Sequence, residues 1–428
     1  MADSKQHILD ELAWRGLTHQ CTEETALRQV LGTPQSVYAG FDPTASSLHV
    51  GSLLPLMMLR RFQKFGHRPI ALVGGATGMI GDPSGKSEER NLLSRESLAE
   101  NVQGMRQQME RFLDFSGTAG AVIVNNYDWM HGWTYLEFLR DIGKNFPVNV
   151  MLSKDSVRSR IERQDGGISY TEFSYMLLQA YDFVYLHRQH SCRLQIGGSD
   201  QWGNITAGID LARRLDSAAL HGLTCPLLLT SDGRKMGKTE KGAIWLDASR
   251  TSPYAFYQYW INVADSDVMM CLRFLTEIDE LEMRGLVNSL ATEPEKRQAQ
   301  KTLAKWLTEF IHGRAGLESA ERATQILFGA EIENLDDRQL CEIFADVPSC
   351  ELPRAVLESG LPIIDALLHV KFATSKGEAR RSLQGGAVAV NNKRVNSVDQ
   401  ILSISDLAGE SVLVLRSGKK NYALMKFS

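Results

Sequence analysis

Apolar residues recur along this chain in short runs separated by longer amphipathic stretches. The runs at residues 37–42 and 68–75 end in turn-forming residues, and a helical pattern with Pro55 in its first turn lies between them. A strand, a helix and a second strand at this spacing form a βαβ unit with parallel strands. Further apolar runs begin at Ala121, Cys192 and Leu223. The pattern predicts a doubly wound α/β fold, which binds ligands at the carboxyl ends of its strands.

The same pattern divides the chain into regions. Residues 1–230 are predicted to form a Rossmann-like domain that begins with an amphipathic helix over residues 5–31. Residues 231–330 start with a loop and continue as a mostly helical region. Residues 331–360 are acidic and less regular, which indicates a linker, and residues 361–428 form a small α+β module with basic character.

Composition narrows the classes of function. A chain of 428 residues is long enough for about two to three domains with cores of their own. Its formal net charge is −4, so a contact with nucleic acid requires a local basic patch. Six cysteines without a C-x-x-C pair argue against a zinc site or a disulfide framework. Because we find neither a signal-peptide pattern nor an apolar run of ~18 residues, we expect a cytoplasmic protein without a membrane partner.

Two short segments carry residues suited to phosphate chemistry. The first is Leu48-His49-Val50-Gly51-Ser52-Leu53, at the predicted start of a helix. There, free N–H groups and the helix dipole favour a phosphate, His49 donates a hydrogen bond or carries charge, and Gly51 permits close backbone approach. The second is Lys235-Met236-Gly237-Lys238-Thr239, which places two ammonium groups on a loop suited to a departing pyrophosphate. Each segment alone fits an ordinary surface turn.

A third feature is a helix predicted to begin at Ser169, which fits a capping box with Glu172. Tyr175, Gln179 and Asp182 follow at i, i+4 and i+7, so a phenol, an amide and a carboxylate share one face. The opposite face is apolar and is expected to pack on the sheet. A polar stripe is ordinarily the solvent face of a helix, but an aromatic residue on it, without Lys or Glu, favours a pocket.

Longer strings make this chain similar to a known family. The two phosphate segments resemble the HIGH and KMSKS signatures of class I aminoacyl-tRNA synthetases. Residues 81–86, 126–129, 175–182 and 197–205 resemble strings of bacterial tyrosyl-tRNA synthetases, and the similarity runs from about Tyr38 to Lys420.

The chain departs from the HIGH signature at one position. Ser52 stands where the signature has its second His, and a hydroxyl donates a hydrogen bond but carries no charge. Gly237 and Thr239 replace the serines of KMSKS, as the bacterial tyrosyl enzymes often do.

The resemblance implies an enzyme that activates L-tyrosine with ATP, releases pyrophosphate and transfers the tyrosyl group to the 3′ end of tRNA(Tyr). It implies a tyrosine site formed by Tyr38, Asp82, Tyr175, Gln179, Asp182 and Gln201. It implies ATP contacts from Gly40, Asp42, His49, Gly51, Gly198, Asp200 and Lys238. The phosphate chemistry would fall to Thr44, His49, Ser52, Lys86, Arg90, Lys235, Lys238 and Thr239. Mg²⁺ is expected to accompany ATP, without a tightly bound metal in the protein.

The resemblance also implies macromolecular partners. Residues 361–428 resemble an S4-type RNA-binding module, whose phosphate contacts weaken with salt. Its expected RNA-binding residues are Lys376, Arg380, Arg381, Lys393, Arg394, Arg416, Lys419 and Lys420. A homodimer is implied through a helical insertion near residues 126–160. Its apolar side chains, which fit a core equally well, are Phe146, Pro147, Val148, Val150 and Met151.

Two alternatives stay open at this point. A tryptophanyl relative shares the fold and the ATP chemistry, although Tyr38 together with Asp182 and the S4-like tail favours tyrosine. A non-catalytic RNA-binding paralogue would explain Ser52 as a trace of decay. A binding module, however, has no use for Lys235, Lys238, Asp82, Asp200 and Gln201.

Overall fold

The structure is a computed structural model with two compact units. One unit comprises residues 1–250 and 263–303, and the other comprises residues 251–262 and 304–428. The described residues are 7–84, 94–162, 167–239, 242–332, 335–345, 347–418 and 421–428. Four predicted site residues lie outside them, namely Lys86, Arg90, Lys419 and Lys420.

The first unit is built on a six-stranded sheet in the order β1-β6-β5-β2-β3-β4. Its strands are β1 (Gln20–Cys21), β2 (Ser36–Phe41), β3 (Arg68–Val73), β4 (Val122–Asn125), β5 (Cys192–Gly198) and β6 (His221–Cys225). All neighbours pair in parallel except β1, which is antiparallel to β6. A separate hairpin joins β7 (Lys238–Thr239) and β8 (Gly242–Ala243). The sheet confirms the doubly wound fold.

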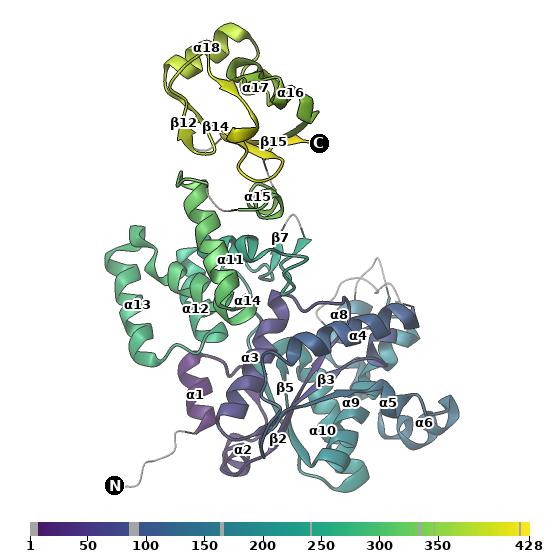
Figure 1. Cartoon of the computed structure of the whole chain (residues 1–428). Coiled ribbons are helices and arrows are strands. Elements are labelled where there is room, and N and C mark those ends of the chain that lie inside the picture. Colours follow the sequence, from purple (N-terminus) through teal and green to yellow (C-terminus); the bar gives the residue numbers. More distant parts are fainter. Residues whose placement is uncertain are drawn as a thin grey trace. The chain divides into compact units, whose positions relative to one another are not determined.

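Helices cover both faces of this sheet, with α3 and α4 on one side and α9 and α10 on the other (Figure 1). The buried residues of α3 are nearly all apolar, and α9 packs along α10. The helices of the first unit are α1 (Ile8–Arg15), α2 (Glu24–Leu31), α3 (Val50–Lys64), α4 (Arg95–Met109), α5 (Tyr127–Met130), α6 (Tyr135–Asp141), α7 (Val148–Leu152), α8 (Asp155–Ile161), α9 (Tyr170–His190), α10 (Trp202–Asp216), α12 (Asp265–Leu275) and α13 (Glu280–Thr292).

Three local predictions about this unit were wrong. The single helix over residues 5–31 is two helices, because Gly16 ends α1 with a φ of 76° that glycine tolerates readily. Pro55 lies in the second turn of α3 rather than the first, since the helix already begins at Val50. The apolar run from Leu223 predicts a strand as far as Leu229, but the strand ends at Cys225, because the next residue is a proline that has no N–H for the ladder.

The second unit contains a five-stranded sheet in the order β12-β11-β14-β15-β9 and a short pair, β10 with β13. The strands are β9 (Ser349–Leu352), β10 (Leu361–Pro362), β11 (Val388–Val390), β12 (Lys393–Arg394), β13 (Ile401–Leu402), β14 (Val412–Ser417) and β15 (Asn421–Phe427). The helices are α11 (Pro253–Ile261), the later part of α14 (Gln298–Leu327), α15 (Asp337–Ile343), α16 (Arg354–Glu358), α17 (Ile363–His369) and α18 (Lys376–Gln384). Among the described residues, no helix has the length and apolarity that crossing a membrane requires.

The linker predicted over residues 331–360 is instead largely structured. Strand β9 pairs in parallel with β15, and α15 packs on the same sheet. Alternation along β14 explains this packing, because Leu413 and Leu415 face one core while Val412 and Val414 face the other. The second core needs Leu340 and its neighbours in α15 to cover it. The prediction missed this because the partner strand lies some 70 residues later in the chain.

Candidate active site

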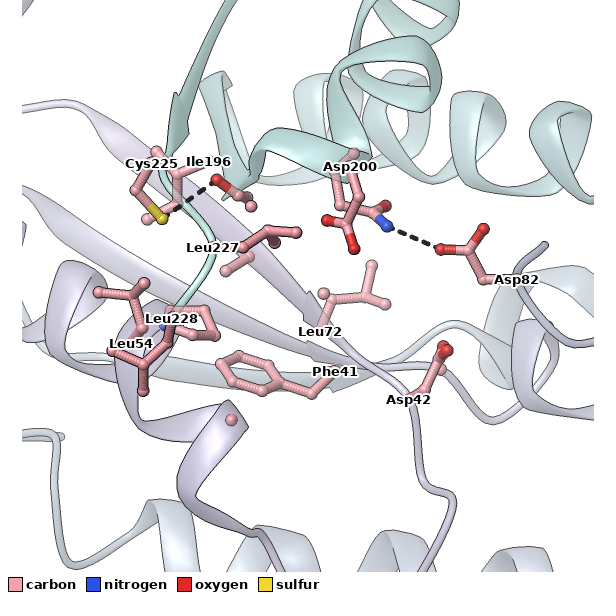
Figure 2. Close-up of a pocket in the computed structure, with 18 of the residues that line it drawn as sticks. Phe41, Asp42, Leu54, Leu72, Asp82, Ile196, Asp200, Cys225, Leu227 and Leu228 are labelled. Atoms are coloured by element: carbon pink, nitrogen blue, oxygen red, sulfur yellow. Dashed lines mark hydrogen bonds between the residues drawn. The ribbon is translucent and has the colours of Figure 1, made fainter. Parts of the chain in front are cut away.

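A cavity of about 330 Å³ opens at the carboxyl ends of β2, β5 and β6. This is where the strand order reverses, the usual ligand site of doubly wound sheets. Figure 2 shows acidic side chains on one side of the cavity, namely Asp42, Asp82 and Asp200, and apolar ones opposite, namely Leu54, Leu228 and Cys225. The predicted site residues that line the cavity are Tyr38, Gly40, Asp42, His49, Gly51, Asp82, Tyr175, Gln179, Asp182, Gly198, Asp200, Gln201, Lys235 and Lys238.

One end of the cavity is formed by Tyr38 and Asp182, both about 1 % exposed. The phenolic oxygen of Tyr38 has no hydrogen-bond partner among the described residues. The Asp182 carboxylate accepts hydrogen bonds from Asn126 Nδ2 at 3.0 Å and from Trp129 Nε1 at 2.8 Å. Burial raises the pKa of Asp182 to about 7, although these two hydrogen bonds oppose the shift. A hydroxyl without a partner beside a buried carboxyl suits a ligand that brings a hydroxyl of its own.

The helix that supplies Asp182 is held firmly at its start. Ser169 caps α9 and accepts a hydrogen bond from the backbone N–H of Glu172, which is one half of the predicted capping box. The Glu172 carboxylate is buried against Arg160, with 2.9 Å between Oε2 and Nη2. Tyr175 and Asp182 then both line the cavity, so the predicted polar face of α9 is a pocket wall.

A second network lies beside this end of the cavity. Gln201 Nε2 donates to Asp82 Oδ2 at 2.7 Å, and Gln179 Nε2 donates to Gln201 Oε1 at 3.2 Å. The backbone N–H of Ser84 donates to Asp82 Oδ1 at 2.8 Å. The two glutamines therefore connect α9 to the loop that follows β3, and they hold a carboxylate at the cavity wall.

The opposite end of the cavity is formed around the start of α3. His49 is the N-cap residue, yet its side chain makes no capping hydrogen bond. Its ring packs edge-on against Trp245, with 6.1 Å between centroids, and Arg250 covers Trp245 at 3.6 Å. A Cβ at Gly51 would lie 2.8 Å from the His49 ring, so only glycine leaves room for it. The first turn of α3 thus presents its backbone to the cavity.

The two phosphate segments are in direct contact. The N–H of Val50 donates to Ile244 O at 3.0 Å, and the N–H of Ile244 donates to Gly237 O at 2.8 Å. Gly237 has a φ of 80°, and a Cβ there would lie 2.6 Å from that of Val50. Lys235 and Lys238, both exposed, therefore stand at the rim of the same cavity as His49.

Three predicted phosphate residues stand apart from this arrangement. Thr44, Ser52 and Thr239 are not among the described residues that line the cavity. Thr44 and Thr239 are exposed and Ser52 is half-buried.

Sequence reasoning missed three polar residues at the end of the cavity formed by Tyr38 and Asp182. Gln195 lines the cavity, is 2 % exposed, and its Oε1 has no hydrogen-bond partner among the described residues. An amide inside the apolar run of β5 was the available signal. Asn126 and Trp129 are recognised only through their bonds to Asp182, which join segments more than 50 residues apart.

Comparisons with known proteins agree with this geometry. Residues 32–329 match the family described as "tRNA synthetases class I (W and Y)", so fold and site define a class I aminoacyl-tRNA synthetase. Residues 339–425 match the "Tyrosine--tRNA ligase SYY-like C-terminal domain". A tyrosine–tRNA ligase of Rhodopirellula baltica is 61 % identical over 427 residues, 99 % of this chain and 97 % of the relative. The chain belongs to the tyrosine–tRNA ligase family.

Two further relatives extend the comparison. A tyrosine–tRNA ligase of Roseiflexus castenholzii is 50 % identical over 422 residues, 98 % of this chain and 99 % of the relative. The crystal structure of a C-terminally truncated mitochondrial tyrosyl-tRNA synthetase of Aspergillus nidulans superposes with a TM-score of 0.68 at 30 % identity. That match covers 76 % of this chain and 94 % of the other. The predicted family and fold class are confirmed.

Proposed function

We propose that this chain activates L-tyrosine with ATP and transfers the tyrosyl group to tRNA(Tyr). The observation that carries the proposal is the buried pair at one end of the cavity. The Tyr38 hydroxyl, which has no hydrogen-bond partner in the described parts of the chain, lies beside Asp182. Both groups would hydrogen-bond the phenolic hydroxyl of tyrosine, and phenylalanine would leave them unpaired. Tyrosine–tRNA ligases are themselves the standard example of such discrimination.

The rest of the amino acid fits the network next to that pair. We assign Asp82, with Tyr175 and Gln179, to the substrate ammonium group, since a carboxylate and two polar side chains line that wall. Gln201, which donates to Asp82, lies beside the carboxylate of the substrate. These contacts hold the nucleophilic carboxylate in place, and positioning of this kind is a large part of the catalysis of a two-substrate reaction.

ATP fits the opposite end of the cavity. The start of α3 at His49 and Gly51 offers the phosphates the positive end of the helix dipole and the imidazole of His49, and Lys235 and Lys238 supply positive charge to the leaving pyrophosphate. Gly40, Asp42, Gly198 and Asp200 line the wall between the two ends and would accommodate the ribose. Mg²⁺ accompanies ATP, because phosphates and water supply most of its ligands. Thr44, Ser52 and Thr239 would join only if the loops close further.

The proposal is tested by tyrosine-dependent exchange of pyrophosphate into ATP, followed by charging of tRNA(Tyr). Tryptophan and phenylalanine serve as the comparison substrates. We expect exchange with tyrosine at a kcat/KM at least about a thousandfold above that with either comparison. Exchange that depends on tryptophan, or none with any amino acid, would overturn the proposal in favour of the two alternatives.

The second unit supports the step that involves tRNA. Lys376, Arg380, Arg381, Lys393 and Arg394 are exposed on α18 and β12, where they can meet phosphates. Arg416 differs, because its guanidinium lies 6.0 Å from the Tyr422 ring and its Nε is buried. We therefore place RNA binding on the first five residues. Lys376 also pairs with Asp365 at 2.9 Å, a bond that RNA would have to replace.

Reversing charge on α18 tests this assignment. The double variant Arg380→Glu with Arg381→Glu should weaken charging about tenfold or more while adenylate formation stays unchanged. The difference from the parent protein should shrink as salt rises, because salt weakens the parent's phosphate contacts as well. The control is Arg338→Glu, an exposed arginine that we do not place at the RNA surface. Equal charging by the double variant and the control would remove α18 from the RNA surface.

We also propose a homodimer through the helical insertion. Val148 and Val150 are 58 % and 41 % exposed, and Leu136 is 76 % exposed. Large apolar side chains with this much exposure favour a protein contact. Met151 and Phe146, named with them from the sequence, are buried or half-buried and belong instead to the core. Sedimentation of Leu136→Glu should show monomers where the parent protein shows dimers.

A further inference from the structure

Helix α4 holds the loop that connects β2 to the phosphate-binding start of α3. That loop, residues 42–49, bears Asp42 and His49 at its two ends, both at the cavity. Between them the backbone is neither helix nor strand, so its buried polar groups need partners outside a regular helix or sheet ladder. Three residues of α4, at positions 101, 104 and 108, approach it from one face of the helix.

Gln108 makes the most extensive of these contacts. Its side chain is 9 % exposed, and its Oε1 accepts a hydrogen bond from the N–H of Leu48 at 2.8 Å. Its Nε2 donates to Ser47 Oγ at 3.0 Å. Ser47 Oγ in turn donates to Leu48 O at 2.8 Å. One amide thereby fixes the two residues that precede His49.

Two further contacts fasten the loop nearer β2. Asn101 Nδ2 donates to Pro43 O at 2.9 Å. A Cβ at Gly104 would overlap the carbonyl oxygen of Ser46, so this position of α4 lies against the loop backbone. From the other side, the N–H of Leu246 donates to Leu48 O at 2.9 Å. The loop is therefore held between α4 and the segment that follows the lysines.

We propose that Gln108 is a positioning residue for the attack on ATP, with Asn101 as a second anchor. This inference rests on the proposed function, and neither residue lines the cavity, so both act through the loop that carries Asp42 and His49. The start of α3 must lie within a fraction of an ångström of its productive place, because displacement of about 1 Å can cost roughly a hundredfold in rate. Tyrosine itself binds at the other end of the cavity and does not depend on this loop.

The neighbouring residue of α4 offers a matched control. Gln107 is exposed, so Gln107→Met makes the same chemical change on the same helix as Gln108→Met. Both are made in the full-length chain, and tyrosine affinity is measured without ATP by calorimetry. The rate of adenylate formation is measured in a single turnover. For Gln108→Met we expect this rate to fall about tenfold to a hundredfold, with tyrosine Kd unchanged.

A merely structural role would give a different result. It would weaken tyrosine binding and adenylate formation by similar factors, or leave the rate within about twofold of that of Gln107→Met, and either outcome overturns the inference. Gln108→Glu retains an acceptor for Leu48 N–H and should recover most of the rate. Asn101→Ala, with exposed Gln103→Ala as its control, carries the test if Gln108→Met does not fold. Absence of tyrosyl adenylate with the parent protein would instead refute the proposed function.

Discussion

The two ends of the cavity differ in how much of their structure is already in place. At the tyrosine end, Tyr38 and Asp182 are buried, and Asn126 holds the carboxylate. At the phosphate end, Lys235 and Lys238 are exposed, and their loop rests on α3 through glycine. Recognition of a small substrate benefits from rigid, desolvated groups, whereas a leaving group needs charge that can approach and withdraw. The difference predicts that mutations will separate substrate affinity from reaction rate.

The largest expected effect comes from removing charge at the phosphate end. Lys238→Met should lower the rate of adenylate formation about a hundredfold or more, because the ammonium acts on charge that develops as pyrophosphate leaves. Tyrosine Kd, measured without ATP, should stay unchanged. Lys144→Met, at an exposed lysine that does not line the cavity, is the control. A parallel loss of tyrosine affinity would contradict the separation of the two ends.

A smaller effect is expected at the tyrosine end. Tyr38→Phe removes a hydroxyl that has no hydrogen-bond partner among the described residues, so we expect the substitution to weaken substrate recognition. We expect the preference for tyrosine over phenylalanine to drop about tenfold, the value of one hydrogen bond. Competition between the two amino acids in pyrophosphate exchange measures it. Tyr127→Phe, at a residue stacked on His131, should leave the preference unchanged.

How much the sequence revealed differs between the two ends as well. The face formed by Tyr175, Gln179 and Asp182 was predictable, because helical periodicity is a local property of the chain. The roles of Asn126 and Gln195 were not, because they depend on which strands become neighbours. Sheet order is a property of the whole fold, and a polar residue in an apolar run does not indicate which residue or ligand it faces.

The same reasoning applies to the phosphate end. Both lysines and His49 were predicted from two short segments, and the fold places them at one cavity. The contact between Gly237 and Val50 was not predicted, since it joins segments 187 residues apart in the printed numbering. The β-strand at residues 349–352 was missed for a related reason. Its partner β15 lies far from it in sequence, as the pairing of Ser349 with Leu424 shows.

The contact between Gly237 and Val50 provides a sharper test of the loop that carries the two lysines. Gly237→Ala adds a Cβ 2.6 Å from that of Val50 and also strains a backbone with a φ of 80°. Gly233→Ala is a matched control, because its φ is 82° but nothing lies within 4 Å of the added Cβ. We expect Gly237→Ala to slow adenylate formation about fivefold more than the control does, with tyrosine Kd unchanged in both. Equal rates of adenylate formation in the two variants would mean that backbone strain, and not the contact with Val50, causes the loss.

The smallest predicted effect is a dependence of tyrosine affinity on pH. It arises from Asp182 and therefore concerns only the end of the cavity that holds Tyr38 and Asp182. Burial raises the pKa of Asp182 from its usual 3.8 to about 7, so the ligand-free protein holds this proton well above the pH at which the unfolded chain loses it. The contribution of Asp182 to stability therefore falls as pH rises between these two values. Tyrosine binding runs in the opposite direction, because the phenolic hydroxyl donates to the ionised carboxylate.

Titration of tyrosine affinity separates this group from the phosphate end. From the fraction of ionised carboxylate, Kd should improve about fourfold between roughly pH 6.5 and pH 8. Asp182→Asn should bind more weakly and lose this dependence, since an amide does not titrate in this range. Asn126→Ala removes a hydrogen bond that lowers the pKa of Asp182, so it should move the midpoint upward. A titration that persists unchanged in Asp182→Asn would assign it to another group and remove Asp182 from the phenol site.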